Sequence, residues 1–442
     1  MDFITQILKP VKRSVGGVKV PHRKNTMDSE TVIMPAPKQV FIPVHQHIGA
    51  PCVPTVKKGD SVKVGQLIAD SENPFSAPVH ASVSGTVSAI TESAMATGQR
   101  VTFIVIDSDG EMTPADGIAP PEINSREDFI AAVRASGLVG LGGAGFPAAI
   151  KLSPAADKNI DTLIINCAEC EPYITSDYRE CIESPEDIMY GIYRVKKLLG
   201  VDRVIICVED NKPEAIRILS EIAAKDDRAG DAVKIMKLRS KYPQGAEKVM
   251  IYSATGRVVP SGKLPADVGC VVMNITSVSF LARYLKTGMP LVSKRITVDG
   301  SAVNNPMNVI VPIGTRICDV IEFTGGLKEE AKKILYGGPM MGMAVYDPEM
   351  PVMKQNNAIL VFDEKDAVPP ESTACIRCGK CVAHCPMKLM PVAVEQALKV
   401  NDIDRLKKLS VLSCMECGCC SYGCPAARPL VQSMKLAKQK VR

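Results

Sequence analysis

Two short segments near the C-terminus of this 442-residue chain contain nine of its sixteen cysteines, and eight of the nine follow a repeated spacing. Both segments have the spacing C-x2-C-x2-C-x3-C-P. One tight loop with this spacing can place three thiolates on three corners of a cubane, while the fourth ligand comes from elsewhere. The spacing predicts two 4Fe-4S clusters and the ligands Cys375, Cys378, Cys381, Cys385, Cys414, Cys417, Cys420 and Cys424.

The last cysteine of each motif serves the other cluster in two-cluster ferredoxins. The expected sets are therefore Cys375, Cys378, Cys381 and Cys424 for one cluster, and Cys414, Cys417, Cys420 and Cys385 for the other. Zinc is the alternative, but it usually takes two C-x2-C pairs and has no use for a third cysteine or the following proline. Cys419 is surplus to the pattern, and we expect it to be packed.

A glycine-rich segment, Gly137-Leu-Val-Gly-Leu-Gly-Gly-Ala-Gly-Phe-Pro-Ala-Ala-Ile-Lys151, is the second candidate site. It follows a predicted helix and not a strand, so it does not meet the requirements of a Rossmann fingerprint. Several glycines with a basic residue behind them expose backbone amides that suit a phosphate or a flavin edge. A flexible turn before the next strand is the alternative.

Four segments carry a family resemblance: Gly142-Gly-Ala-Gly-Phe-Pro147, Asn166-Cys-Ala-Glu-Cys-Glu-Pro172, Tyr242-Pro-Gln-Gly-Ala-Glu247 and Val271-Val-Met-Asn274. In type and order they resemble the flavin-binding subunit of respiratory complex I. The resemblance implies an FMN site over which NAD(H) stacks. The implied cofactor-binding residues are Gly140, Gly142, Gly143, Gly145, Phe146, Lys151, Asn166, Glu169, Glu171, Tyr242, Gly245, Glu247 and Asn274.

The same resemblance implies roles for individual side chains. Lys151 and the loop would hold phosphate and flavin, while Glu169 and Glu171 would fix ribose or nicotinamide groups, with no residue acting as nucleophile or proton donor. The alternative for the two glutamates is that they are helix-end carboxylates facing water. Two positions depart from the family pattern, Ala168 and Ala246, and two cysteines of the acidic segment are expected to line the pocket, Cys167 and Cys170.

Strand and helix patterns predict a multidomain α/β and α+β fold. The expected segments are an N-terminal extension (1–37), a β barrel-sandwich (38–108), an FMN/NAD(H)-binding α/β domain (125–290), a β-grasp unit similar to soluble-ligand-binding (SLBB) domains (291–345) and a two-cluster ferredoxin-like α domain (365–442). A proline-rich linker from Asp107 to Asn124 separates the second segment from the third.

The predicted barrel-sandwich looks like biotinyl and lipoyl carriers but has no lysine between Ser71 and His80, so it is expected to be scaffold. Its strands are predicted at Val53–Val56, Gln66–Ala69, Ala81–Val83 and Thr86–Ile90. His45 and His47 alternate along one strand, and we expect a solvated strand face there in preference to a metal pair.

In the α/β domain, alternating elements imply a mainly parallel sheet. They are a helix over Glu127–Ala135, a strand over Thr162–Asn166, a helix over Pro185–Leu199, a strand over Arg203–Val208 and a helix over Pro213–Ala224. Later elements are predicted at Arg295–Gly300, Val309–Ile313, Ile317–Phe323 and, as the connection between the cysteine motifs, Val392–Leu409.

The order of these domains, together with Gly337-Gly-Pro-Met-Met-Gly342, is similar to the RnfC component of the Rnf complex. That complex is an ion-translocating NAD:ferredoxin oxidoreductase, so the resemblance implies partners in a membrane-embedded complex and electron exchange with a ferredoxin-type subunit. Two alternatives remain: a cluster-only electron adaptor without flavin or nicotinamide, and a non-redox assembly subunit stabilised by zinc.

Composition and charge limit the remaining function classes. The net charge of +5 is spread over 53 basic and 48 acidic residues, and aromatics make up only 4%, so no nucleic-acid function is expected. No secretory signal and no apolar span of ~20 residues is visible. We expect a peripheral protein on the cytoplasmic side of the cell membrane. Four apolar residues at helical spacing could bind a membrane partner, although four residues are weak evidence: Phe3, Ile4, Ile7 and Leu8.

Overall fold

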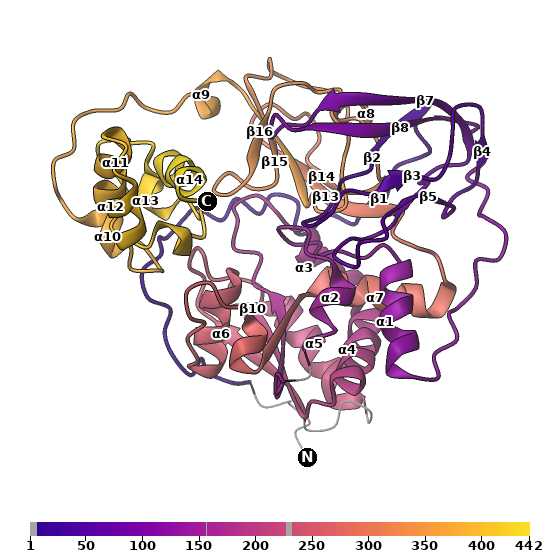
Figure 1. Cartoon of the computed structure of the whole chain (residues 1–442), viewed down its shortest axis with the longest axis horizontal. Coiled ribbons are helices and arrows are strands. Elements are labelled where there is room, and N and C mark those ends of the chain that lie inside the picture. The colour runs from indigo at the N-terminus through magenta and orange to yellow at the C-terminus, as the bar shows by residue number, and fades with distance from the viewer. Residues whose placement is uncertain (1–6, 156, 227–231) are drawn as a thin grey trace.

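The computed structural model describes residues 7–155, 157–226 and 232–442. In Figure 1 the barrel strands lie next to the sheet that contains β13 to β16, and the α/β layer lies below both. The C-terminal helices stand to one side and connect to the rest through a long extended segment that follows α9 (Glu364–Ala367).

Short antiparallel strands build the barrel-sandwich. Side chains that alternate along them, such as Val40, Ile42 and Ile104, are fully buried between the sheets. One sheet has the order β2-β8-β7-β4 and the other β3-β5-β6. The strands are β2 (Gln39–Pro43), β3 (Val53–Pro54), β4 (Ser61–Val62), β5 (Leu67–Asp70), β6 (Val79–His80), β7 (Gly85–Ala94) and β8 (Arg100–Ser108).

Two predictions for this module are wrong. Ala81–Val83 is not a strand, because β6 ends at His80 and Ala81 instead bonds irregularly to the turn at Gly65 and Gln66. His47 is not on a solvated face, because β2 ends at Pro43 and neighbouring domains cover the turn that follows. Only 6% of His47 is exposed, and burial lowers its pKa to about 4.

The α/β domain has a four-stranded parallel sheet with the order β11-β10-β9-β12. Helices α1, α4, α5 and α7 pack on one face, and α6 packs on the other. The strands are β9 (Thr162–Cys167), β10 (Arg203–Glu209), β11 (Val233–Leu238) and β12 (Cys270–Asn274). The helices are α1 (Arg126–Ala135), α2 (Ala148–Lys151), α3 (Ser176–Glu183), α4 (Pro185–Leu199), α5 (Pro213–Lys225), α6 (Glu247–Thr255), the 3-10 turn η2 (Pro265–Val268) and α7 (Ile275–Thr287).

The third sheet has six strands in the order β1-β14-β13-β17-β15-β16. Its outer strand β1 (Val32–Ile33) comes from the N-terminal segment, and its central strand β17 (Ala358–Phe362) comes from beyond residue 345. The other elements are β13 (Ser293–Asp299), β14 (Met307–Pro312), α8 (Ile317–Phe323), β15 (Lys333–Tyr336) and β16 (Met343–Val345). Distant parts of the chain therefore complete this sheet.

The C-terminal domain is helical and repeats one short unit. It contains α10 (Lys380–Ala383), α11 (Pro391–Lys399), α12 (Ile403–Lys408), the 3-10 turn η3 (Val411–Ser413), α13 (Cys419–Tyr422) and α14 (Leu430–Val441). The connection predicted as one helical stretch is broken between α11 and α12, where Asn401 has a left-handed φ of 52°. Val394, Leu406, Val411 and Met434 form its small core.

The N-terminal segment of residues 7–34, called the strap below, crosses several domains. Leu8 packs against the parallel sheet by pairing with Met236, so it is not part of a free partner-binding face. Phe3 and Ile4 lie outside the described residues. Further contacts of the strap are Gly17 with His384, Val18 with Tyr242, His22 with Tyr173, Thr26 with Thr175, and β1 with β14.

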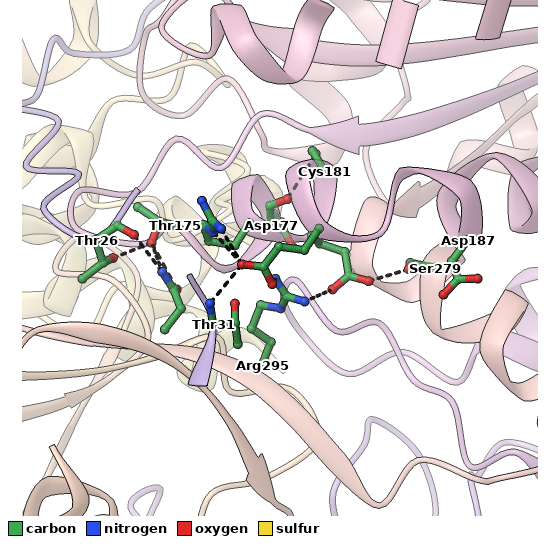
Figure 2. A network of polar contacts seen from close by, with 12 residues as sticks. Thr26, Thr31, Thr175, Asp177, Cys181, Asp187, Ser279 and Arg295 are labelled. Atoms are coloured by element: carbon green, nitrogen blue, oxygen red, sulfur yellow. Dashed lines mark hydrogen bonds and ion pairs between the residues drawn. The ribbon is translucent and has the colours of Figure 1, made fainter. Parts of the chain in front are cut away.

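A polar network joins the strap to α3, α7 and β13 (Figure 2). The Thr31 amide donates to Glu183 Oε1 at 3.0 Å, and Arg295 donates to the other oxygen of Glu183 at 2.6 Å. Glu180 is 1% exposed and pairs with Arg295 at 3.3 Å. Although burial raises the pKa of Glu180, Arg283 and Arg295 hold it below its usual value. The carboxylate therefore stays charged and fixes three elements to one another.

Candidate functional site

The two cysteine motifs adopt the same backbone conformation. Arg377 and Glu416 occupy equivalent places and have left-handed φ values of 56° and 60°. Their amides donate to the Sγ atoms of Cys375 and Cys414 at 3.4 and 3.3 Å. N–H groups directed at sulfur are the contacts that stabilise cluster thiolates. Each loop therefore curls round its own cysteines in the way that a cluster requires.

Four cysteines from both motifs line one cavity of about 370 Å³: Cys375, Cys378, Cys381 and Cys424. A single zinc ion would need its thiolates about 2.3 Å away, whereas a cavity of this size accommodates a multi-atom cluster. The residues present thus fit a 4Fe-4S cluster. The assignment of individual ligands stays a prediction, which the presence of Cys424 in this cavity supports.

The other four cysteines lie deeper. Cys385 and Cys414 pack against the core of the C-terminal domain, and Cys417 and Cys420 are buried. Cys419 is fully buried, with its Sγ 3.8 Å from the Tyr242 carbonyl oxygen. Cys419 is therefore a packed side chain, as expected.

The residues with the family resemblance gather at the carboxyl ends of the parallel strands. Chain order reverses beside β9, because β10 lies on one side of it and β12, formed later, on the other. Asn274 ends β12, and its partner in the β9–β12 register is Asn166, the penultimate residue of β9. Ligands of open α/β sheets bind in the crevice at such a switch point.

The glycine-rich loop reaches this crevice with its exposed tip. A Cβ on Gly142 would lie 2.5 Å from Asn274 Nδ2, so the loop backbone touches the end of β12. A Cβ on Gly143 would meet no protein atom within 4 Å. Gly142 is thus required for packing, whereas Gly143 faces open space in which a ligand can approach the backbone.

Other domains hold both sides of this loop. On one side the Leu141 amide donates to Ser277 Oγ at 3.1 Å, and Lys294 of β13 donates to the Leu141 carbonyl at 3.0 Å. On the other side the amide of Ile48, in the barrel-sandwich, donates to the Gly145 carbonyl at 3.1 Å. The barrel-sandwich and the β-grasp unit therefore both support the loop as scaffold.

Two aromatic rings meet next to the loop. Phe146 makes an edge-to-face contact with Phe75 of the barrel-sandwich, with ring centroids 5.3 Å apart. Lys151 Nζ lies 5.9 Å from the Phe146 ring centroid. Phe75 was not expected from the sequence, and nothing in the pattern of its segment distinguished it from an ordinary loop residue.

Lys151 and Glu247 are brought together, since their side chains form an ion pair at 3.0 Å. Lys151 also donates to the Val272 carbonyl at 2.9 Å, so it is tied to β12. Glu247 begins α6, whose N-terminus has no side-chain cap. The backbone N–H groups of that first turn are free to bind an anionic or carbonyl oxygen in the crevice.

Asn166, Asn274 and Gly245 form hydrogen bonds with other protein groups in the crevice. Asn166 donates to the Gly245 carbonyl at 2.8 Å and accepts from the Ala168 amide at 3.1 Å. Asn274 caps α7 and donates to Asp177 Oδ2 at 2.7 Å. Asp177 is a contact that sequence reasoning missed, because it lies in α3 outside the matched segments.

Glu169 and Glu171 have different surroundings. Glu169 accepts from the amides of Asp177 and Tyr178, so it is a helix-end carboxylate at α3, and the residue is half-buried. Burial raises its pKa to about 7. Glu171 differs from Glu169 because its carboxylate contacts a distant part of the chain, the segment 337–342.

The Glu171 carboxylate accepts from the amides of Met340 and Met341 at 3.0 and 2.9 Å. A Cβ on Gly338 would lie 2.2 Å from Glu171 Oε2, so the segment 337–342 wraps closely round this side chain. Burial raises the pKa of Glu171 to about 6, although the two amides act against this rise. The match of Gly337–Gly342 to the family thus has a structural reason.

Tyr242 lies behind the crevice with 1% of its surface exposed. Its hydroxyl is 3.4 Å from Glu171 Oε1, and it packs with Cys170, Cys417 and Cys419. Cys170 also accepts from the Gly245 amide at 3.3 Å. The predicted flavin segment and the second cysteine motif therefore share one contact zone.

Two lysines support the acidic segment, the half-buried Lys24 and the buried Lys212, and neither was predicted from the sequence. Lys24 of the strap donates to the carbonyls of Glu169 and Glu171 at 2.8 and 2.9 Å. Lys212 donates to the Ala168 carbonyl at 2.6 Å. Isolated lysines outside any motif carry no signal in one sequence, because the groups that they bind are main-chain atoms.

Fold and sites define a multidomain iron-sulfur protein with a flavin-binding domain. Four family models match in order: the RnfC barrel-sandwich hybrid domain over residues 12–111, the Nuo51 FMN-binding domain over 133–283, the SLBB domain over 295–344 and the 4Fe-4S dicluster domain over 369–425. These domains imply FMN and two 4Fe-4S clusters, and they confirm the predicted fold class.

Curated relatives resemble nearly the whole chain. The corresponding component of the proton-translocating ferredoxin:NAD+ oxidoreductase complex of Clostridium ljungdahlii is 43% identical over 84% of this chain and 80% of its own length. Its counterpart in the Na+-translocating complex of Acetobacterium woodii is 41% identical over 96% of each chain. The protein belongs to the RnfC family of ion-translocating ferredoxin:NAD+ oxidoreductase (Rnf) complexes, as its sequence motifs predicted.

A solved structure shows the same fold at low identity. The NAD+-reducing NiFe hydrogenase in its H2-reduced state aligns with a TM-score of 0.50 and 19% identity, over 72% of this chain and 62% of the hydrogenase chain. Among the described residues, no helix has the length and apolar character needed to cross a bilayer.

Proposed function

We propose that this chain is the NAD(H)-facing subunit of its complex and exchanges electrons between NAD(H) and a ferredoxin-type subunit. The observation that carries the proposal is the contact zone of Tyr242, Cys170 and Cys417, where the predicted flavin segment and the second cysteine motif meet. A bound flavin would supply hydride exchange with the nicotinamide and one-electron exchange with the clusters.

The residues of the chain have binding and orienting roles in this proposal. The free amides of the Gly142–Ala144 tip and of the α6 N-terminus hold phosphate and flavin oxygens. Glu171, fixed by the Met340 and Met341 amides, accepts hydrogen bonds from ribose or nicotinamide. Phe146 supplies an apolar face. Attachment to the cytoplasmic side of the cell membrane is proposed to occur through partner subunits.

Gly143→Val is the variant that tests the site. Because a Cβ at Gly143 meets no protein atom, the variant should fold normally while its side chain occupies the space of the ligand. We expect at least about tenfold weaker FMN binding, since overlap with even one methyl group costs more than ~1.4 kcal/mol. NADH oxidation by ferricyanide should fall equally, whereas dithionite should still reduce the clusters.

Gly143→Ala is the graded control, because its smaller side chain should weaken FMN less. If the valine variant bound FMN and oxidised NADH as well as the wild type does, the flavin would have to bind elsewhere. Flavin absent from anaerobically purified, FMN-reconstituted wild type would favour the cluster-only adaptor.

A further inference from the structure

The two cysteine motifs share their spacing but have opposite surroundings. Every residue from Cys375 to Lys380 is exposed, and Ile376 at the loop tip has 67% of its surface accessible. In the second motif Cys417 and Cys419 are buried beneath Val18 and other residues of the strap and the α/β domain. The first motif therefore faces solvent, and the second faces the protein.

The second motif also contacts the elements that surround Glu171. A Cβ on Gly418 would lie 2.8 Å from the Met340 carbonyl oxygen, and the amide of the same Met340 binds Glu171. No comparable contact ties the described residues of the Cys375–Lys380 loop to the crevice: their neighbours are Cys424, Gln396 and other residues of the C-terminal domain. The exposed motif is thus the one that another protein can approach.

The C-terminal domain, which presents this exposed motif, carries more positive charge than the rest of the chain. Residues 371–442 carry twelve Lys or Arg against five Asp or Glu, a net charge of +7, whereas the whole chain has +5. Within the described residues, ion pairs involve neither Arg377 nor Lys380, while Arg428 at the same cavity is paired with Glu395 at 2.5 Å. The mouth of the first cavity therefore combines an apolar tip with two basic side chains, Arg377 and Lys380, that pair with no acidic side chain of the described residues.

We propose that the Cys375–Lys380 loop is the docking surface for an acidic iron-sulfur protein that exchanges single electrons with the first-motif cluster. Complementary charge steers such a partner, and the exposed Ile376 supplies a small apolar contact of the kind found in transient complexes. Each encounter oxidises one cluster and reduces the other by one electron, with no bond broken. The inference rests on the proposed function, since it assigns the end of that electron path that faces the ferredoxin-type partner.

The test uses full-length, cluster-loaded protein and an acidic two-cluster ferredoxin as probe, with a basic cytochrome c in a separate arm. Arg377→Glu combined with Lys380→Glu should raise the dissociation constant for the ferredoxin at least about tenfold at low salt and flatten its salt dependence. The measurement is direct binding by biolayer interferometry, together with the rate of ferredoxin reduction.

Lys440→Glu combined with Arg442→Glu is the matched control, with the same charge change. Lys440 is ten residues along α14 from Leu430, which lines the cavity, and therefore about 15 Å away. This control pair should change binding less than threefold. The proposal would be overturned if both double variants weakened ferredoxin binding equally, or if the Arg377→Glu and Lys380→Glu pair did not weaken it. Tighter binding of the basic cytochrome than of the ferredoxin would also overturn it.

Iron content and the paramagnetic spectrum of each variant establish that the clusters are intact. If the first pair loses iron, Gln396→Glu replaces it, because Gln396 lines the same cavity from α11 outside the motif. Its binding should weaken about threefold, and unchanged binding would overturn the proposal. NADH oxidation by ferricyanide is measured in parallel: its absence in wild type contradicts the proposed function, but leaves the ferredoxin-binding result to decide the docking surface.

Discussion

Lysines that are half-buried or buried orient the main chain around the crevice by donating to carbonyl oxygens. Lys24 binds the carbonyls of Glu169 and Glu171, and Lys294 binds that of Leu141. In a trans peptide the following N–H points the opposite way, so a carbonyl fixed by a lysine turns the next amide away from it. The Gly142 amide is thus directed away from Lys294. These lysines act on the site through the backbone, as positioning residues.

Replacing Lys24 by Met should loosen the acidic segment. The change leaves buried carbonyls without a donor, which costs about 1–3 kcal/mol for each unsatisfied group. We expect a lower thermal midpoint and a KM for NADH raised more strongly than kcat falls. Lys19→Met is the control, because Lys19 lies exposed on the same strap. An unchanged KM in the Lys24 variant would show that the lysine has no positioning role.

Glu171 should make nicotinamide binding depend on pH. Its pKa of about 6 lies above the ordinary value of 4.5, so the native protein takes up this proton before the unfolded chain does. Burial of the charged form therefore destabilises the native state above pH 6, and this cost is relieved as pH falls from about 6 to 4.5. Protonation also removes a charged acceptor, so KM for NADH should rise as pH falls through 6.

Glu171→Gln should remove this pH dependence and raise KM about fivefold at neutral pH, because a neutral acceptor is weaker by ~1 kcal/mol. Flavin affinity should change less. Steady-state kinetics with ferricyanide between about pH 5 and 8 on both proteins make the comparison. A KM that keeps its rise at acidic pH in the variant would assign the titration to another group.

At the scale of elements, the two motif loops form a repeated unit, and we predict that the last cysteine of each motif binds the cluster of the other. Cys424 of the second motif lines the cavity of the first. Cys385→Ser should accordingly alter the spectrum and potential of the cluster of Cys414, Cys417 and Cys420, while Cys381→Ser alters the other. Paramagnetic resonance of both reduced variants distinguishes the signals. The reverse pattern would mean that each motif keeps its own fourth cysteine.

Elements with strong local signals were predictable from the sequence. Helix α4 has the predicted bounds Pro185–Leu199, because Pro185 opens it and Gly200 closes it in a left-handed conformation. The cysteine motifs were equally predictable, because the spacing of their cysteines determines how one short loop can place three thiolates around a cluster. The solvated face expected at His47 failed because tertiary packing decides exposure, and the alternation of polar residues does not report which domains will cover them.

The crevice was only partly predictable. Matched motifs identified the loop and the acidic segment, and the parallel strands bring both to one sheet edge. The sequence did not reveal that Tyr242 is buried against Cys419, or that Lys151 is paired with Glu247. Such contacts join residues far apart in the chain and follow from how whole domains dock. The net charge of the whole chain, +5, also did not reveal that residues 371–442 alone carry +7.

At the scale of the whole molecule, the barrel-sandwich and the six-stranded sheet support the α/β domain from one side, and the C-terminal helices attach beside it (Figure 1). Because the proposal assigns membrane attachment to partner subunits, the purified chain should not float with neutral liposomes, and should do so once those subunits are reconstituted. Flotation through a density gradient measures this. Tight binding of the isolated chain would contradict the proposed mode of attachment.

The strap has a consequence for the order of synthesis. It leaves the ribosome well before the cysteine motifs, but Gly17 bonds to His384 and a Cβ on Gly16 would lie 2.7 Å from the Cys385 carbonyl carbon. These contacts cannot form until the first cysteine motif has been translated, because a non-local pair needs both of its partners. A prematurely terminated chain that ends before the cysteine motifs therefore leaves the middle of the strap without these anchors, open to a protease that the finished protein resists.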